Sequence, residues 1–339
     1  MLKRYIGIIF LLVSTLGWSQ QDPYFSHYMF MGSYYNPGIA GLEGKSRATL
    51  VHQSTWLGYQ PTYEEDGGAP HTQVLTGDHP LSLFGSNATN SGASLVVTND
   101  IIGPMVNLQA KVGFSYHINL STGGVLGIGL RAGAYSYRIR PRYRAIDEEE
   151  LLTNSDVNKQ IRPDMDFGLW YNTSKYYGGI SITHVVPFDF DFDVPGINTS
   201  LTQHLYINGG YNIDLSGSLV LTPTLIVFSD IVQTQYDFGL TASLNNYKYW
   251  AGVNFKQYFT TEPVNQSGLQ WITEGMSFKI GTTTLKDDVL RVGYAFNWVM
   301  SGVSAKNPTS HELFLSYILP ITKDVGYQNS GSPRFRHDD

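Results

Sequence analysis

The chain has 339 residues, and only 15% of them are charged, against roughly 25% in soluble domains. A net charge of −6 gives no basis for nucleic-acid binding, and the lack of cysteine excludes disulfides and thiolate metal sites. The mean hydropathy of −0.15 is too low for a bundle of membrane helices. A membrane β-barrel, with an apolar outer face and a polar lumen, accounts for both the low charge and the moderate hydropathy.

The N-terminus has the pattern of a signal peptide. A basic start precedes an apolar run over residues 6–16, and small residues flank Trp18. We predict cleavage after Ser19 or Gln20, with residues 1–19 as the signal peptide. No later stretch is apolar over the roughly 18 residues that a spanning helix needs, so we expect insertion through strands.

Most of the mature chain alternates between apolar and polar residues over segments of nine or more residues, the length of a tilted membrane strand. We therefore predict an all-β fold, a transmembrane antiparallel β-barrel of about 14 strands over residues 45–320. The predicted strands are 46–55, 70–78, 91–99, 105–118, 124–137, 164–173, 176–185, 203–214, 217–228, 234–244, 247–257, 270–281, 288–300 and 309–319.

The charges within these segments favour a barrel over a soluble β-sandwich. Lys111, Arg131, Asp237 and Arg291 all occupy the polar phase of the alternation. On the lipid face an Arg or Lys near mid-bilayer costs about 2–4 kcal/mol, whereas a lumen position is polar. A sandwich also alternates, but its outer face is normally richer in Lys and Glu than the polar phase is here.

The connections differ in length, which predicts an orientation. Short turns of such barrels lie on the periplasmic side and longer loops outside. The extracellular candidates are 138–163, 186–202, 258–268 and 301–308, and residues 321–339 form a C-terminal tail.

The sequence carries no HExxH, GxSxG or GxGxxG motif in a fitting context. We therefore expect no enzyme activity, no cofactor site and no metal site.

A series of short blocks, in family order, resembles the PorP/SprF family of type IX secretion and gliding-motility proteins. The blocks are 21–30, 36–41, 53–58, 69–73, 79–81, 291–297, 310–317 and 333–335. Two departures are Gly38, where the family usually has Ala, and Asn297, where it usually has Asp. The family-motif residues, candidates for partner binding, are Asn36, Pro37, Gly41, Trp56, Gly58, Pro70, Thr72, Gln73, Asn297, His311, Glu312, Arg334 and Phe335.

Two local structures are expected around these blocks. Asn36-Pro37 suits a turn, and residues 20–44 are expected to form an ordered N-terminal segment in the lumen or on the periplasmic rim. His311 and Glu312 are expected to form a polar clasp at the start of the last strand. That clasp either holds the barrel closed or contacts a partner.

The resemblance implies a non-enzymatic protein of the outer membrane. Such a barrel binds and anchors, or helps to export, a surface adhesin or other type IX cargo with a type B C-terminal domain. It works with other outer-membrane type IX components, and the SprF-like branch serves gliding motility. The alternatives are a diffusion porin and a small-molecule transporter; a transporter of the fatty-acid type needs an apolar pocket, whereas the predicted lumen is polar.

Overall fold

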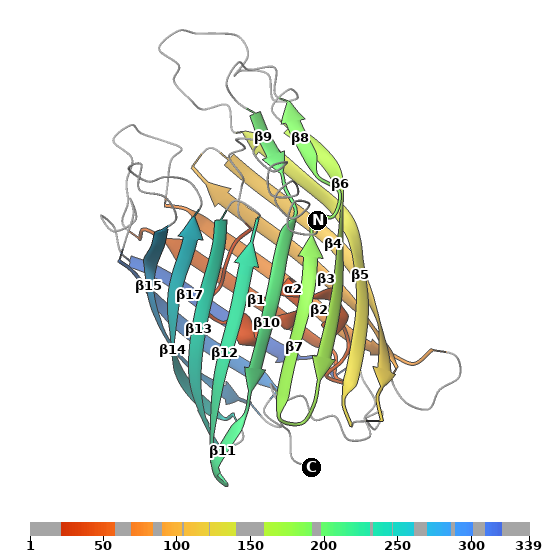
Figure 1. The fold of residues 1–339 in the computed structure, drawn as a ribbon, viewed down its shortest axis with the longest axis vertical. Helices are drawn as coiled ribbons and strands as arrows, with labels where there is room; N and C mark the ends of the chain where they lie inside the picture. Colours follow the sequence, from red (N-terminus) through yellow and green to blue (C-terminus); the bar gives the residue numbers. More distant parts are fainter. Residues whose placement is uncertain are drawn as a thin grey trace, which may run out of the picture.

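The computed structural model shows a closed antiparallel β-barrel of 14 strands (Figure 1). Each strand pairs with its neighbours in sequence, and the barrel closes where the first wall strand pairs with the last. The structure describes residues 22–57, 69–83, 90–103, 105–121, 123–139, 159–191, 198–230, 233–245, 247–260, 270–285, 289–300 and 309–320. The prediction of a 14-stranded transmembrane barrel is confirmed.

Each predicted strand overlaps one strand of the wall. The wall strands are β1 (Arg47–Thr55), β2 (His71–Leu81), β3 (Ser91–Ile102), β4 (Met105–Asn119), β5 (Val125–Ile139), β6 (Lys159–Asn172), β7 (Tyr176–Thr183), β10 (His204–Tyr211), β12 (Leu219–Ser229), β13 (Gln233–Leu244), β14 (Tyr249–Thr260), β15 (Gln270–Thr284), β16 (Leu290–Val299) and β17 (Thr309–Ile318). Three shorter strands lie outside this ring: β8 (Phe188–Asp191), β9 (Asn198–Leu201) and β11 (Ile213–Ser216).

Three predicted boundaries were wrong. The predicted strand 203–214 is two strands, β10 and β11. β10 pairs with β7 as far as Tyr211, and β11 then pairs with β12 instead. The predicted loop 138–163 is shorter, because residues 159–163 extend β6 by pairing with β5. The predicted loop 186–202 contains the β8–β9 hairpin. In each case the boundary depends on which strand pairs with the segment, and the alternation within the segment does not show its partner.

The two faces of the wall separate as the alternation predicts. On β4, the side chain of Val112 is on the outer face and the residue is 65% exposed, while the neighbouring Lys111 is 3% exposed. On β5 the same contrast holds between Leu130, at 57%, and Arg131, at 3%. The outer face is therefore apolar, as contact with lipid requires, and the charged residues point into the lumen.

The longest connections between wall strands lie at one end of the barrel. Because successive strands are antiparallel, the connections that follow β1, β5, β7, β14 and β16 all lie at one end. These include all four predicted extracellular segments. We call this end of the barrel the long-loop end. Its exposure outside the cell remains a prediction.

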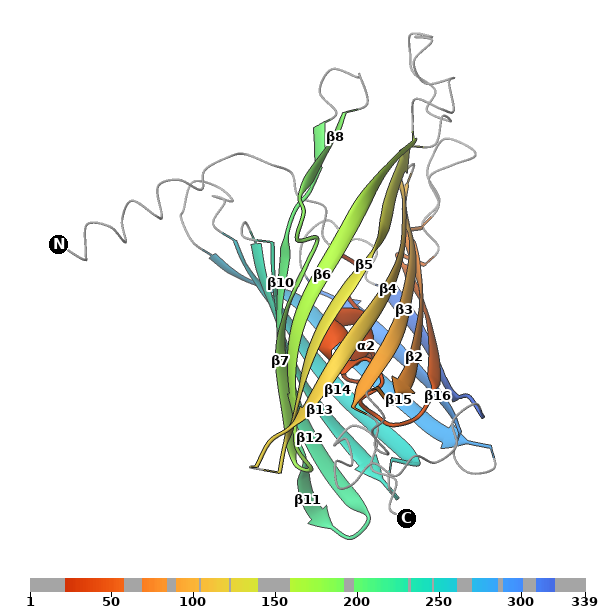
Figure 2. The same cartoon turned by 90° about the vertical axis from the view of Figure 1, so that its right-hand side faces the viewer.

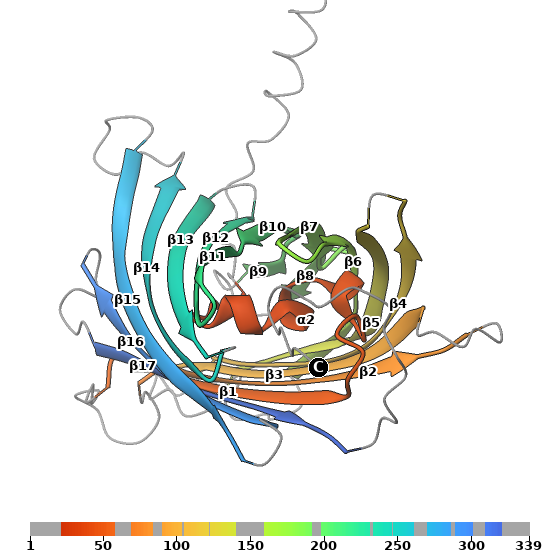
Figure 3. The same ribbon diagram turned by 90° about the horizontal axis from the view of Figure 1, so that it is seen from below.

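The N-terminal residues occupy the barrel interior. The helices of this segment are η1 (Tyr28–Phe30), α2 (Gly32–Tyr35) and η2 (Pro37–Ile39). Seen from the side (Figure 2) and from below (Figure 3), α2 lies inside the ring of strands. Every residue from 25 to 42 is buried. We call residues 22–44 the plug. Among the described residues, no helix is both long and apolar enough to cross a membrane.

The main hydrophobic core is formed between the plug and the wall. The plug contributes its aromatic and methionine side chains, and the wall contributes Val51, Val74, Phe228, Trp250 and Phe314, among others. The predicted lumen was polar and charged, but the wall also presents an apolar surface to the plug. Apolar lumen-facing residues of the wall face apolar residues of the plug, so both surfaces are removed from water.

Glycines in the wall let the plug backbone approach closely. A Cβ atom at Gly92 of β3 would overlap the carbonyl of Ala40, and one at Gly129 of β5 would overlap the backbone of Pro37. At Gly41 the plug itself has a φ of +69°, a conformation that favours glycine. The high glycine content thus serves the fit between wall and plug in these places.

Candidate functional site

The interface between plug and wall is the candidate functional site, because many buried polar side chains of the wall contact the plug there. One contact centres on Glu312 of β17. Its carboxylate accepts hydrogen bonds from the backbone N–H groups of Ser26, at 2.7 Å, and His27, at 3.0 Å. The His27 Nδ1 atom lies 2.5 Å from Glu312 Oε1, and the His27 ring stacks on Phe314. These three contacts compensate the burial of the carboxylate.

Three further wall strands, β14, β15 and β16, hold the plug residue Ser26. The Ser26 hydroxyl lies 2.5 Å from Asn297 Oδ1 and 3.1 Å from Ser277 Oγ. The Asn254 amide donates to the Ser26 carbonyl at 3.1 Å. Asn297, the position where the family usually has Asp, thus has a neutral carbonyl oxygen that accepts from a hydroxyl, and this contact needs no ion pair.

The middle of the plug is fixed by Asn36. Its Oδ1 atom accepts from the Gly38 N–H at 2.8 Å, which caps η2. Its Nδ2 atom donates to the carbonyls of Leu169, at 2.9 Å, and Ile180, at 3.2 Å, on β6 and β7. One side chain therefore shapes the predicted turn and attaches it to the wall.

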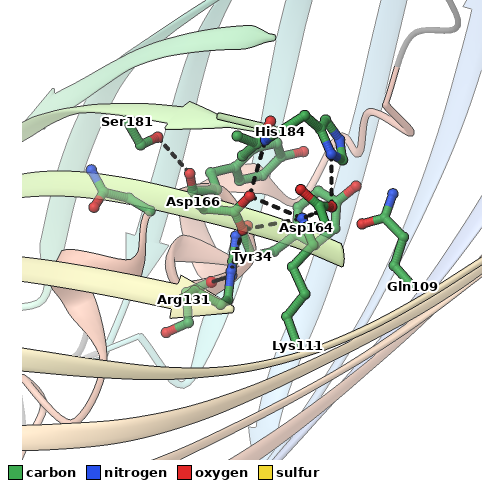
Figure 4. A network of polar contacts seen from close by, with 12 residues as sticks. Tyr34, Gln109, Lys111, Arg131, Asp164, Asp166, Ser181 and His184 are labelled. Carbon is green, nitrogen blue, oxygen red and sulfur yellow. Dashed lines mark hydrogen bonds and ion pairs between the residues drawn. The ribbon is translucent and has the colours of Figure 1, made fainter. Parts of the chain in front are cut away.

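A buried charge network lies beside α2 (Figure 4). Arg131 donates to the carbonyls of Ser33, at 2.6 Å, and Tyr34, at 3.0 Å, and its Nε atom lies 2.6 Å from Asp166. Lys111 bridges Asp164, at 2.6 Å, and Asp166, at 2.9 Å. The lumen charges thus form ion pairs with one another and hold plug carbonyls.

The start of the plug contacts the long-loop end of the lumen. Asp22 Oδ1 lies 3.0 Å from Nε2 of His184, which follows β7. The Nδ1 atom of His184 lies 2.7 Å from Asp164 Oδ2. Asp22 Oδ2 also accepts from the Tyr206 hydroxyl at 3.0 Å. His184 therefore bridges an aspartate of the plug and an aspartate of the wall.

His311 and Glu312 do not form one clasp. Adjacent residues of a strand point to opposite faces. Glu312 points inward to the plug, while Nδ1 of His311 lies 2.6 Å from the Tyr294 hydroxyl in an exposed contact. The interpretation of the pair as a joint clasp was wrong; of the two, Glu312 contacts the plug and His311 lies on the opposite face.

The remaining sequence candidates are spread over the barrel. Pro37 and Gly41 pack against wall glycines, and Thr72 donates to Asp100 at 2.6 Å. Pro70 and Gln73 lie near the long-loop end, where the Pro70 carbonyl accepts from the Thr55 N–H and Gln73 Oε1 accepts from Asn99. Trp56 has a positive φ of 56° just after β1. Gly58, Arg334 and Phe335 lie outside the described residues.

The sequence indicated some members of this interface but missed others. Lys111 and Arg131 were recognisable as lumen charges, and Asp164 and Asp166 share a strand phase with each other. Nothing in the sequence connects Asp22 to His184 or His27 to Glu312, since these pairs are separated by 162 and 285 residues.

Comparisons with solved structures return membrane barrels of low identity. The "CymD monoaromatic hydrocarbon channel" is 11% identical, with a TM-score of 0.47, covering 86% of this chain and 91% of that one. The "TodX deltaS2S3 mutant monoaromatic hydrocarbon channel" is 9% identical, with a TM-score of 0.43 and coverage of 86% and 92%. A Pseudomonas aeruginosa FadL homologue is 11% identical, with a TM-score of 0.42 and coverage of 83% and 91%. TM-scores this low support no conclusion about function.

The sequence comparison is more informative. No curated protein shows significant similarity to the chain. The family described as "Type IX secretion system membrane protein PorP/SprF" matches residues 18–317, nearly the whole chain. This match includes the plug and the 14 wall strands except for the last residue of β17. The chain therefore belongs to the PorP/SprF family of type IX secretion system membrane proteins.

Proposed function

We propose that the protein is a non-enzymatic, plugged barrel of the outer membrane that binds and anchors, or helps to export, a type IX cargo. The cargo class is a surface adhesin, or another secreted protein, with a type B C-terminal domain. Family membership supports work alongside other components of the type IX system. The single structural observation that carries the proposal is the filled lumen, since every residue from 25 to 42 is buried inside the wall.

A filled lumen leaves the rims and the loops for contact with a partner. Binding residues often lie on loops that a rigid scaffold positions. Here the longest connections gather at one end, and the β8–β9 hairpin extends from that same end (Figure 1). We propose this end as the docking face for cargo, facing outward once the predicted signal peptide has directed export.

Deletion of the gene tests the proposal. We expect a type IX cargo protein to disappear from the cell surface while uptake of small solutes is unchanged. Cargo released into the medium supports anchoring, and cargo retained inside the cell supports a role in export. Unchanged surface cargo in the deletion strain contradicts the proposal.

Conductance separates this function from the porin alternative. We expect the purified protein in planar bilayers to show little conductance, because the plug fills the wall. A large, stable pore together with unchanged surface cargo establishes the diffusion porin instead.

A loop variant tests the docking face. Shortening the β5–β6 connection, over residues 140–158, should weaken cargo retention while the barrel still assembles. Shortening the β2–β3 connection, over residues 84–89, provides the matched control at the opposite end of the barrel. Equal loss of cargo in both variants argues for a general defect rather than a specific contact.

A further inference from the structure

Three potential metal ligands from distant parts of the chain converge at the start of the plug. Asp22 belongs to the plug, His184 follows β7, and His204 begins β10. Their donor atoms all lie within 4.8 Å of one another. Asp22 Oδ1 is 3.0 Å from His184 Nε2, and Asp22 Oδ2 is 3.4 Å from His204 Nδ1. We propose that these residues bind a divalent transition-metal ion, such as Zn²⁺, which fastens the plug to the wall.

The distances suit such an ion. Zn²⁺ binds His nitrogen and carboxylate oxygen at about 2.0–2.2 Å, so neighbouring ligand atoms of a tetrahedral site are about 3.3 Å apart. The two ligand separations at Asp22 lie on either side of that value. Two histidines and one carboxylate are also a ligand set found in zinc and non-haem iron sites, with a further position left for water. A small cavity adjoins this point and gives a water molecule room; its lining includes Asp22, Gln109 and Tyr206, and also Lys111 and Arg131, which are paired with Asp164 and Asp166.

His184 has the support that a metal-binding histidine usually has. Its Nδ1 atom lies 2.7 Å from Asp164 Oδ2, and its backbone N–H donates to Asp166 at 3.2 Å. A carboxylate that accepts from one ring nitrogen fixes the tautomer and turns the lone pair of the other nitrogen toward the metal. With its proton on Nδ1, His184 would present a lone pair to the Asp22 carboxylate. Two acceptors 3.0 Å apart need a cation between them, either a proton or a metal ion.

The lack of hydrogen bonds at His204 among the described residues is independent evidence for a metal ion at this site. Its side chain is fully buried, yet neither ring nitrogen makes a hydrogen bond within the described part of the chain. Buried polar groups normally have a partner. A metal ion between Asp22 and His204 would satisfy the imidazole and explain why it points at a carboxylate from beyond normal hydrogen-bond range.

A second cluster, made of Asp164, Asp166 and His184, is a weaker candidate. Lys111 already binds both of its carboxylates, and Arg131 binds Asp166. Asp22, by contrast, has no Lys or Arg partner among the described residues, and its ion pairs are with the two histidines. Asp164 and Asp166 are therefore already neutralised by Lys and Arg side chains, whereas Asp22, the carboxylate of the proposed site, is paired only with histidines among the described residues.

Metal titration of the purified, detergent-solubilised full chain tests the site. After removal of metals with a chelator, we expect one Zn²⁺ to bind per chain, and Co²⁺ to give the visible absorption of a low-coordinate site. His204→Gln should weaken binding by at least about 100-fold, and Asp164→Asn by about 10- to 100-fold. His117→Gln, at another buried lumen-facing histidine, is the matched control and should bind like the parent. Binding that is absent, or unchanged in His204→Gln, overturns the proposal.

Labelling of a single thiol tests the fastening. The chain has no cysteine, so Pro23→Cys introduces a unique thiol beside Asp22. We expect Zn²⁺ to slow its labelling in the parent background by at least about tenfold and to have no effect beside His204→Gln. Each variant must first show the gel mobility of a folded barrel without heating. An equal labelling rate with and without Zn²⁺ refutes a metal that fastens the plug.

Discussion

Replacing Glu312 by alanine should release the start of the plug. The substitution removes the acceptor for two backbone N–H groups and for the His27 ring, all of them buried. Hydrogen bonds to a charged group contribute about 1.5–3 kcal/mol each but are not additive. Since about 1.4 kcal/mol corresponds to a tenfold change, the equilibrium should shift by more than about 100-fold toward an undocked plug.

The measurement is thiol labelling at Pro23→Cys, which should become much faster in the Glu312→Ala background. His311→Ala is the matched control, because it removes the neighbouring side chain on the opposite face and an exposed contact with Tyr294. That control should change the docking free energy by less than about 0.5 kcal/mol, as for other surface changes. Similar labelling rates in the two backgrounds would refute the assignment of Glu312 as a residue that holds the start of the plug.

Three further changes probe the wall and the plug separately. Leu240→Arg, on the outer face, should reduce barrel stability by about 2–4 kcal/mol if it lies near mid-bilayer, as measured by denaturant unfolding in lipid vesicles. Gly129→Ala should displace the plug backbone at a cost of about 1–3 kcal/mol and speed thiol labelling; Gly77→Ala, whose Cβ would make only an ordinary van der Waals contact with Leu95 at 3.8 Å, should not. Arg131→Met should leave Asp166 with less compensation and lower the melting temperature of the folded barrel, with a cost of about 3–5 kcal/mol.

The wall could be predicted because its two faces contact different solvents. Val112 is on the lipid side and Lys111 is on the lumen side. Because side chains alternate along a strand, the alternation of apolar and polar residues predicts which way each one points. The filling of the lumen could not be predicted in the same way. Val51 and Phe314 are apolar residues at lumen positions of strands β1 and β17, but the alternation does not show whether water or protein faces them.

The same limit applies to position 241. From the alternation alone, an arginine there would point into a wet lumen and be tolerated. In the structure Thr241 is fully buried and its hydroxyl lies 3.3 Å from the Met29 sulfur. An arginine at this position would therefore displace the plug.

The plug contacts could be predicted only in part. The family resemblance marked Asn36, Asn297 and Glu312 as candidates, and each contributes to the fixing of the plug. Their partners depend on the register of strands that are distant in sequence. His27 and Asp22 were not marked as site residues, because a single polar residue has no readable partner until the barrel is closed.

The plug also links the two strands at which the barrel closes. In the pairing of β1 with β17, Gln53 lies opposite Glu312. Glu312 holds Ser26 and His27, while the Gln53 amide donates to the Tyr24 carbonyl at 3.2 Å. Plug residues close together in the sequence are therefore attached to both sides of the seam. Parting of β1 from β17 must break plug contacts as well as ladder hydrogen bonds, and an undocked plug leaves the buried Glu312 carboxylate without partners. Closure of the barrel and docking of the plug are thus thermodynamically coupled, which explains why an internal segment with little regular structure is held so firmly in the wall.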